Sequence, residues 1–286
     1  MKIECRGVSY RYDMSGDEWA IRDINLDITQ GEKIAIIGPA GSGKTTLIEL
    51  LDALILPAQG DVLYDGSSIR ELSRTKQLTS IRRRIGVLFQ FPEHQFFHES
   101  AYEELTFTLK NFVALEAGEI EEQARQMMKR FHLDIEKLKI ISPFNLSSGE
   151  KRKLALASAL MTSPEVLILD EPTAGMDALG RKEIIKIISS FTDTTVILVT
   201  HNQEDFLSIV DRVIGISKGA KVMDVERDEL VDHLATMDEA GIIPPLVLTV
   251  QHWLKESGCK PDRRYFDMDD LIAFFRREMS VKKEHS

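Results

Sequence analysis

The segment that most constrains this chain is a glycine-rich loop, GPAGSGKT at residues 38–45, between an apolar run and a helix-forming segment. It fits the pattern G-x-x-x-x-G-K-[ST], whose glycines let successive backbone N–H groups point inward around phosphates. A helix expected over residues 45–54 adds the positive end of its dipole. Lys44 should then reach the β- and γ-phosphates of a nucleotide, and the Thr45 hydroxyl should bind Mg²⁺. A glycine-rich turn with a surface lysine is the weaker interpretation.

A second strong feature is VLILDE at residues 166–171, an apolar strand that ends in two carboxylates. In open α/β sheets, the carboxyl ends of buried strands face the crevice that binds ligands. Asp170 is therefore expected to hold Mg²⁺ through its water shell, and Glu171 to accept a proton from the attacking water. A strand that happens to end in an acidic turn is the alternative, which the nearby phosphate loop disfavours.

The hydrophobic pattern predicts an α/β core. Residues 33–37, 166–169 and 195–199 are continuously apolar and rich in Ile and Val, which suits parallel strands covered by helices on both faces. Residues 3–12 and 20–28 alternate instead, which is typical of antiparallel strands with one exposed face. We expect a mixed-sheet core with an antiparallel β subdomain.

Helical periodicity divides the rest of the chain. Charged residues recur among apolar ones over about residues 95–162, which predicts a helical subdomain inserted between core strands. The main domain is expected over residues 1–220 and a C-terminal extension over residues 221–286.

The C-terminal extension contains a short predicted strand at residues 221–225 and helices at residues 245–257 and 268–279. It offers no recognisable chemistry. Dimer contact is its first expected role, and regulation is the second.

The composition excludes several classes of protein. The apolar runs are far shorter than the roughly 18–20 residues that cross a bilayer, and no secretion signal precedes residue 3, so the chain is expected in the cytoplasm. A net charge of −10 disfavours a nucleic-acid partner, because such binding needs basic side chains that neutralise phosphates. The short basic runs at residues 82–84 and 151–153 are interpreted as solvated helix faces. Cys5 and Cys259 give no disulfide framework and are expected as free thiols.

Further motifs narrow the nucleotide-binding classes. LSSGE at residues 146–150 resembles the LSGGQ signature of the ATP-binding-cassette (ABC) family, although Ser148 and Glu150 depart from it. Replacing glycine by serine at 148 preserves the Ser-x-Gly geometry but adds a side chain, which would fit a heterodimer with unequal sites.

Four other positions resemble family motifs in the family's order. Gln90, after the strand expected at residues 85–89, resembles the Q-loop; Asp177 resembles the D-loop; His201 resembles the switch histidine; and Tyr12 matches the aromatic residue that stacks on adenine. The combination covers residues 3 to about 217 and is highly specific. The expected fold is the phosphate-loop NTPase fold of ABC ATPases.

The resemblance implies that two subunits close head to tail, each trapping ATP between its own phosphate loop and the other's signature. Catalysis is then expected from Lys44, Glu171 and His201, and Mg²⁺ binding from Thr45, Gln90 and Asp170. The cofactors implied are ATP and Mg²⁺. The signature acting in trans is Ser147, Ser148, Gly149 and Glu150, with Asp177 in the D-loop. The implied nucleotide-binding residues are Tyr12, Gly38, Pro39, Ala40, Gly41, Ser42, Gly43, Lys44, Thr45, Thr46 and Gln90.

Within the family, FQFPEHQ at residues 89–95 and AGIIPP at residues 240–245 resemble the ATPase subunits of energy-coupling-factor (ECF) transporters and the related cobalt and nickel importers. That resemblance implies a peripheral ATPase at the cytoplasmic face of the membrane, in a homo- or heterodimer with a second ABC ATPase subunit. It also implies a transmembrane coupling subunit and a membrane protein that captures a vitamin or transition-metal ion. Phe91, Phe96 and Phe97 are either a docking patch for the coupling subunit or ordinary core.

Three alternatives stay open at this point. The chain is otherwise the ATPase of another ABC importer or exporter, a soluble regulatory ABC protein that acts on the ribosome or on DNA, or a metabolite kinase. The kinase predicts phosphate transfer to a small molecule, whereas the ATPase predicts phosphate release to water.

Overall fold

The computed structural model describes residues 1–13, 18–258 and 261–284. Its centre is a six-stranded sheet in the order β10-β9-β3-β8-β7-β6, in which all neighbours are parallel except β9 and β10. Its strands are β3 (Lys33–Ile37), β6 (Ile85–Leu88), β7 (Val166–Asp170), β8 (Thr195–Val199), β9 (Arg212–Ser217) and β10 (Ala220–Glu226).

The three strands predicted as parallel and doubly covered, β3, β7 and β8, lie next to one another. Every residue of β7 and β8 is buried, as are four of the five residues of β3. The prediction of an α/β core is confirmed. Because parallel strands share one carboxyl edge, the segments that follow β3, β7 and β8 meet at that edge.

A smaller antiparallel sheet in the order β2-β1-β4-β5 flanks the core. Its strands are β1 (Ile3–Tyr10), β2 (Ile21–Ile28), β4 (Gln59–Tyr64) and β5 (Ser67–Ser68). The helix α1 (Lys44–Leu51) packs with apolar residues of both sheets in one core cluster. The expected antiparallel β subdomain is therefore present, and short helices α2 (Ile69–Arg74) and α3 (Leu78–Arg82) lead from it to β6.

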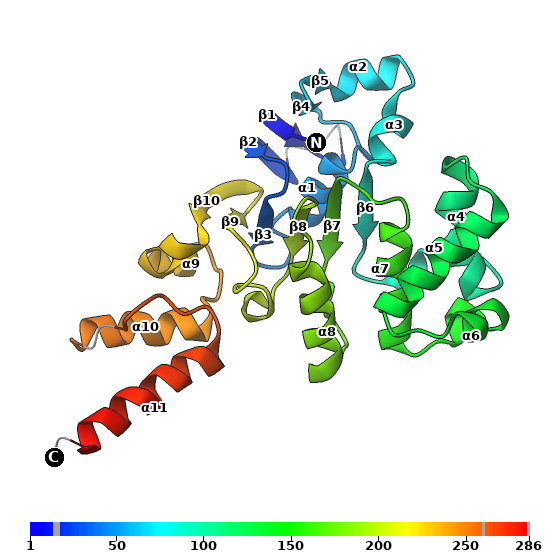
Figure 1. The fold of residues 1–286 in the computed structure, drawn as a ribbon. Coiled ribbons are helices and arrows are strands. Elements are labelled where there is room, and N and C mark those ends of the chain that lie inside the picture. Colours follow the sequence, from blue (N-terminus) through cyan, green and yellow to red (C-terminus); the bar gives the residue numbers. More distant parts are fainter. Residues whose placement is uncertain (14–17, 259–260, 285–286) are drawn as a thin grey trace.

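A helical insert lies beyond β6 (Figure 1). Its helices are α4 (Ala101–Phe112), α5 (Ala117–Arg130), α6 (Ile135–Ile140) and α7 (Ser148–Leu160). The helix α7 contacts both α4 and β6, and α8 (Ala178–Ser189) follows β7. Short 3₁₀ turns η1 (Pro92–His94), η2 (Pro143–Asn145) and η3 (Gln203–Asp205) join these elements. The insert matches the helical region expected between core strands.

The C-terminal segment packs at the opposite, β10 edge of the sheet (Figure 1). The six-stranded sheet continues through Glu226, and then come η4 (Arg227–Asp232), α9 (Leu234–Glu239), α10 (Leu246–Glu256) and α11 (Met268–Glu284). The Gln251 amide joins α10 to the segment before α11, since it donates to the Tyr265 carbonyl at 2.6 Å and accepts from the Tyr265 N–H at 2.8 Å.

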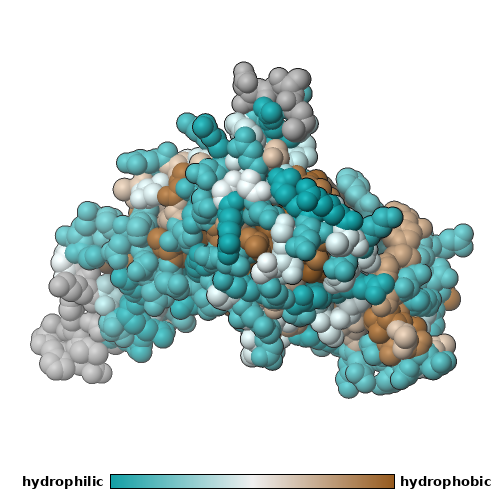
Figure 2. Space-filling view, turned by 90° about the horizontal axis from the view of Figure 1, so that it is seen from above, coloured by the Kyte–Doolittle hydropathy of each residue, from teal (hydrophilic) through white to brown (hydrophobic). Residues whose placement is uncertain are grey.

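The surface is mainly hydrophilic, and apolar side chains gather in small groups, one of them on the side of the insert (Figure 2). No helix among the described residues combines the length and the apolar character that a bilayer crossing requires. Cys5 is a buried free thiol, whereas Cys259 lies outside the described residues.

Candidate functional site

The phosphate loop, residues 38–43, joins β3 to α1 at the carboxyl edge of the sheet. Gly43 has a φ of 104°, and a Cβ there would come within 2.5 Å of the Ala20 carbonyl oxygen, so only glycine fits. Among the described residues no side chain caps α1, and the buried Ser42 hydroxyl has no hydrogen-bond partner. Open N–H groups at a helix N-terminus and an unpaired hydroxyl together suit an anion such as phosphate.

Lys44 begins α1 and folds back over the loop. Its ammonium group donates to the carbonyl oxygens of Gly38 and Pro39, each at 2.8 Å. Burial lowers the pKa of Lys44, while the nearby carboxylates of Glu171 and Asp170 act in the opposite direction. Two neutral carbonyl oxygens thus hold the ammonium group beside the loop. Charged oxygens, such as those of a phosphate, would be stronger acceptors for the same group.

A pocket of about 750 Å³ opens over the loop. Tyr12 stands at its rim with 64% of its surface exposed, and its hydroxyl lies 3.0 Å from the Thr46 hydroxyl and donates to Glu49 at 3.1 Å. Tethered at its hydroxyl, the ring remains available to a planar ligand. The sequence-predicted residues that line the pocket are Tyr12, Gly41, Ser42, Gly43, Lys44, Thr45 and Thr46; Trp19 and Lys218 also line it and were missed. The sequence did offer a signal for Trp19, because it is one of only two tryptophans and lies close to Tyr12 along the chain.

The two carboxylates at the end of β7 are both buried and adjacent. Burial, reinforced by the charge of Glu171, raises the pKa of Asp170 to about 6, although Lys44 and Arg152 lower it. One oxygen of Glu171 accepts from the His201 N–H at 2.7 Å and lies 2.5 Å from the His201 Nδ1. The other accepts from the Thr200 hydroxyl at 3.1 Å. The predicted base and the predicted switch histidine are therefore in direct contact.

The signature segment begins α7. Ser147 caps the helix by accepting from the Glu150 N–H, and the Glu150 carboxylate accepts in return from the Ser147 N–H at 3.0 Å and hydroxyl at 2.8 Å. Lys137 donates to the same carboxylate at 2.7 Å, and this ion pair is the largest cause that lowers the pKa of Glu150 to about 2. The departure from glutamine at this position thus produces a charged capping box.

A second pocket, of about 530 Å³, opens over the signature. It is lined by all four signature residues and by Asp177, whose carboxylate caps α8 by accepting from the Gly180 N–H at 2.7 Å. A Cβ built on Gly149 meets no atom within 4 Å, so this surface is open. Among the described residues, the signature pocket and the phosphate-loop pocket have no lining residue in common.

The structure therefore brings one group of predicted residues together and leaves another apart. Lys44, Asp170, Glu171 and His201 gather where β3, β7 and β8 end. The signature and Asp177 face a different pocket, and Gln90 lies between the two groups, where its carbonyl oxygen accepts from Arg152. The predicted site residues of a single chain therefore line two separate pockets.

The basic run at residues 151–153 corrects one sequence-based interpretation. It was expected to be a solvated helix face, but Arg152 is buried, with 6% of its surface exposed. The helix α7 packs against α4 and β6, so its middle positions face the protein interior rather than water.

Comparison with known proteins agrees with this geometry. The ABC transporter family model matches residues 21–174. The energy-coupling factor transporter ATP-binding protein EcfA2 of Clostridium tetani is 37% identical, over 97% of this chain and 98% of that protein. The structure of cbiO1 from Clostridium perfringens, described as part of the ABC transporter complex cbiONQ, is 30% identical with a TM-score of 0.69, over 87% of this chain and 97% of that one.

Another similar solved structure contains a bound nucleotide. The dimeric ATP-binding cassette MJ0796, in a post-hydrolysis state bound to ADP and Pi, is 27% identical with a TM-score of 0.71, over 79% of this chain and 98% of that one. The expected ABC-ATPase fold is thereby confirmed. A family match over more than half of the chain, with a relative of 37% identity along nearly its whole length, shows that this chain belongs to the ABC transporter family.

Proposed function

We propose that this chain is the ATP-binding and ATP-hydrolysing subunit that energises an ECF-type transporter for uptake of a vitamin or a transition-metal ion. One observation carries the proposal. The phosphate loop, the paired carboxylates and the switch histidine meet at one edge of the sheet, while the signature occupies a separate open pocket. The named relatives, an ECF ATP-binding protein and a part of cbiONQ, support the transport role.

In the proposed mechanism, the loop N–H groups and the α1 N-terminus hold the phosphates, and Lys44 transfers its hydrogen bonds from the loop carbonyls to the β- and γ-phosphates. Three oxygen donors suit Mg²⁺: Thr45, Gln90 and Asp170. The raised pKa of the buried Asp170 supports the fit, because a cation there would stabilise its charged form. Mg²⁺, when bound, would neutralise charge on the phosphates.

Glu171 is proposed to take the proton of the attacking water, and His201 to support that water and the γ-phosphate. In the present structure the Glu171 carboxylate accepts from Thr200 and His201, so its orientation is already fixed. The His201 side chain is 74% exposed, which leaves it room to turn toward a substrate.

Completion of the site is proposed to need a second ABC ATPase subunit, whether a copy of this chain or a paralogue. Its signature would bring a serine hydroxyl and the N–H groups of a helix N-terminus to the γ-phosphate. The C-terminal extension, residues 221–286, is proposed to add a dimer contact; Ile243, which is exposed, is its clearest apolar candidate.

Gly149→Asp tests the requirement for a second subunit. Because the position is open, the substitution should leave folding and ATP binding by the isolated chain unchanged, whereas the added carboxylate should repel the phosphate of the opposed subunit. We expect ATP turnover to fall by about tenfold or more. Turnover and nucleotide affinity are measured side by side, with Gly118→Asp, equally open on α5, as the control. Unchanged turnover would contradict the two-subunit site.

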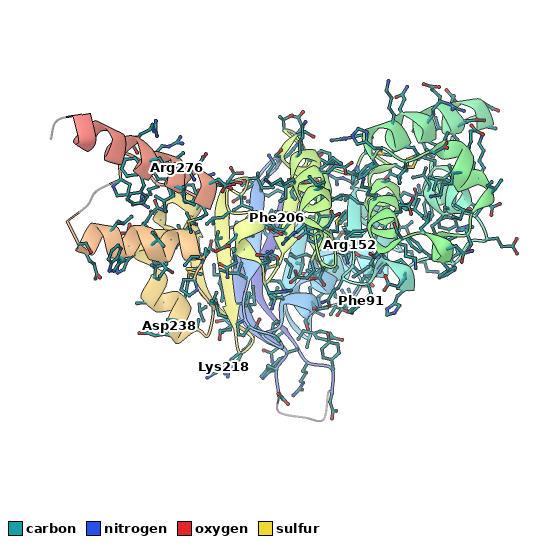
Figure 3. All side chains as sticks on the ribbon, turned by 90° about the horizontal axis from the view of Figure 1, so that it is seen from below. Phe91, Arg152, Phe206, Lys218, Asp238 and Arg276 are labelled. Atoms are coloured by element: carbon teal, nitrogen blue, oxygen red, sulfur yellow. The ribbon has the colours of Figure 1, made fainter. Side chains whose placement is uncertain are left out.

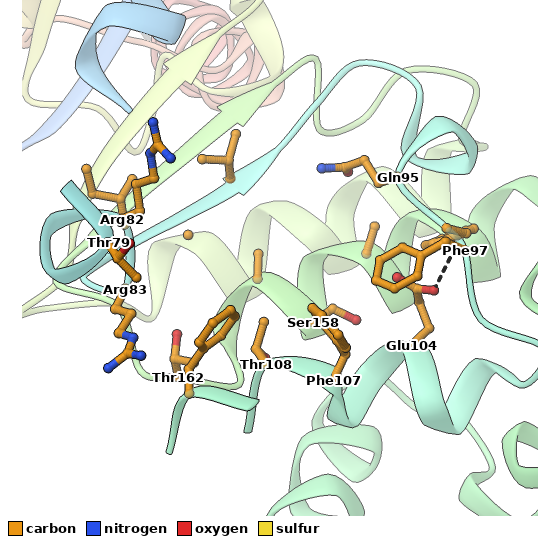
Figure 4. Close-up of a pocket in the computed structure, with 17 residues that line it drawn as sticks. Thr79, Arg82, Arg83, Gln95, Phe97, Glu104, Phe107, Thr108, Ser158 and Thr162 are labelled. Atoms are coloured by element: carbon orange, nitrogen blue, oxygen red, sulfur yellow. Dashed lines mark hydrogen bonds between the residues drawn. The ribbon is translucent and has the colours of Figure 1, made fainter. Parts of the chain in front are cut away.

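A groove of about 540 Å³ between α3, β6, α4 and α7 is the proposed dock for the transmembrane coupling subunit (Figure 4). Phe97, with 63% of its surface exposed, and Phe112 give it an apolar wall, while Phe96 belongs to the core. Glu104 shapes this wall, since its carboxylate accepts from the N–H groups of Phe97 and His98. Of the three phenylalanines considered from sequence, one is core and two are exposed, and only Phe97 of the exposed pair lines the groove.

Phe97→Asp should weaken assembly with the coupling subunit by about tenfold or more, because the groove would lose apolar contact area and gain a charge. ATP binding should not change, since Phe97 lies outside the phosphate-loop pocket. The measurement is the yield of membrane partners on affinity isolation from detergent-solubilised membranes. Ile140→Asp, at a largely exposed position on α6, is the control. Recovery of ribosomes or nucleic acid in place of a membrane partner would overturn the transport role.

A further inference from the structure

Arg152 is a buried arginine with two backbone partners from two different motifs. Its Nη1 donates to the carbonyl oxygen of Glu171 at 2.5 Å, and its Nη2 donates to the carbonyl oxygen of Gln90 at 2.8 Å. The side chain leaves α7 five residues after Ser147 and lies between the sheet and the insert (Figure 3). One guanidinium group therefore links the signature helix, the backbone of Glu171 and the Q-loop.

Burial lowers the pKa of Arg152, and nearby carboxylates offset part of this effect. Glu93, Glu171 and Asp170 surround it and favour its charged form against the cost of burial. The guanidinium is planar and presents its donors as a rigid fork, so the two carbonyl oxygens it binds are held at a fixed separation. A lysine would keep the charge but not this fork.

Glu171 needs such support because its backbone is strained. Its φ is 50°, a left-handed conformation that non-glycine residues adopt rarely. The Glu171 N–H donates to the Val199 carbonyl at 2.8 Å, and the carboxylate accepts from Thr200 and His201. The carbonyl oxygen is the remaining polar atom, and it accepts from Arg152 Nη1 and, at 3.1 Å, from the Ala174 N–H. Removing Arg152 would break the contact that ties this carbonyl oxygen to the helical insert.

Gln90 connects the same guanidinium to the docking groove. The chain runs from Gln90 through η1 to Gln95 and Phe97, both of which line the groove. A displacement of this segment changes where the Gln90 carbonyl lies, and the rigid fork relays the change to the Glu171 backbone.

We propose that Arg152 is a positioning residue that sets the orientation of Glu171 according to the position of the Q-loop. The inference rests on the proposed role of Glu171 as the base. It goes further in assigning a role to a side chain outside the phosphate loop, the signature and the switch segments.

The test compares Arg152→Met and Arg152→Lys in the full chain assembled with its transporter partners. Arg152→Met should lower kcat for ATP hydrolysis by 10- to 100-fold, with KM for ATP and the affinity for a fluorescent ATP analogue within about threefold of the native values. Arg152→Lys should restore part of kcat only. Arg125→Met, on the exposed face of α5, is the matched control and should match the native chain.

A double variant separates positioning from general damage. Adding Arg152→Lys to Glu171→Gln should lower kcat by less than twofold beyond Glu171→Gln alone, because both changes act through one carboxylate. A full additive loss, or a fall in kcat that only tracks the fraction of nucleotide-binding protein, would overturn the inference. If Arg152→Met does not fold, the kcat values of Arg152→Lys and of the double variant test the inference instead. Normal turnover in Glu171→Gln would instead overturn the proposed base itself.

Discussion

Glu171→Gln should bind ATP as the native chain does and hydrolyse it at least about 1,000-fold more slowly. The amide keeps the shape of the side chain and one acceptor oxygen for Thr200 or His201, so the fold and the pocket should persist. It cannot take a proton from water at neutral pH. The substitution should therefore slow the hydrolysis step and leave nucleotide binding unchanged. ATP-bound dimers should therefore accumulate, because the trapped nucleotide is not consumed.

Single-turnover phosphate release, nucleotide affinity and size-exclusion chromatography with ATP are the three measurements for this variant. Glu122→Gln, on the exposed face of α5, should behave as the native chain in all three. Turnover within a few fold of the native rate would remove Glu171 from its role. A third outcome, transfer of phosphate to an added small molecule, would favour a kinase.

Lys44→Met should fail at nucleotide binding, the step before hydrolysis. We expect its nucleotide affinity to fall by about 100-fold or more and its turnover to be unmeasurable. The substitution retains an apolar stem of similar length but removes the charge that the β- and γ-phosphates would meet. In the present structure the ammonium group donates to two loop carbonyls, so the fold depends little on its charge and the melting temperature should shift by a few degrees at most.

Equilibrium binding of a fluorescent ATP analogue measures that loss directly. Lys129→Met, at an exposed site on α5, is the control and should bind nucleotide normally. Tight binding by Lys44→Met would show that the loop N–H groups suffice and that the lysine is dispensable. The pair of variants separates binding from chemistry, since Lys44→Met should lose both and Glu171→Gln only the second.

The parts of the fold that sequence patterns predicted are those that local chemistry determines. Strands β3, β7 and β8 read as unbroken apolar runs because helices cover both faces of the sheet. The phosphate loop, the carboxylate pair and the switch histidine stand at the carboxyl ends of these three strands. The strand β9 was missed because Gly215 interrupts its apolar run. That glycine suits tight packing, since a Cβ there would lie 3.1 Å from the Met223 Cβ on β10.

Sequence patterns could not predict the contacts that depend on tertiary packing. Arg152 sits in a run of three basic residues that looks solvated, and only the packing of α7 on β6 and α4 makes it internal. Likewise Phe96 and Phe97 are neighbours of one type and both line the groove, yet Phe96 is buried in the core and Phe97 is exposed. Motif spacing therefore located the candidate nucleotide site, whereas the connections between its parts required the three-dimensional structure.

The proposed division of each nucleotide site between two subunits also has a cellular consequence. A chain synthesised in excess of its membrane partners meets another free cassette only by diffusion, so at low abundance its ATP consumption should rise with the square of its concentration. Chains outside a transporter complex would hence hydrolyse little ATP. Total ATP consumption would follow the number of assembled complexes rather than the amount of this polypeptide.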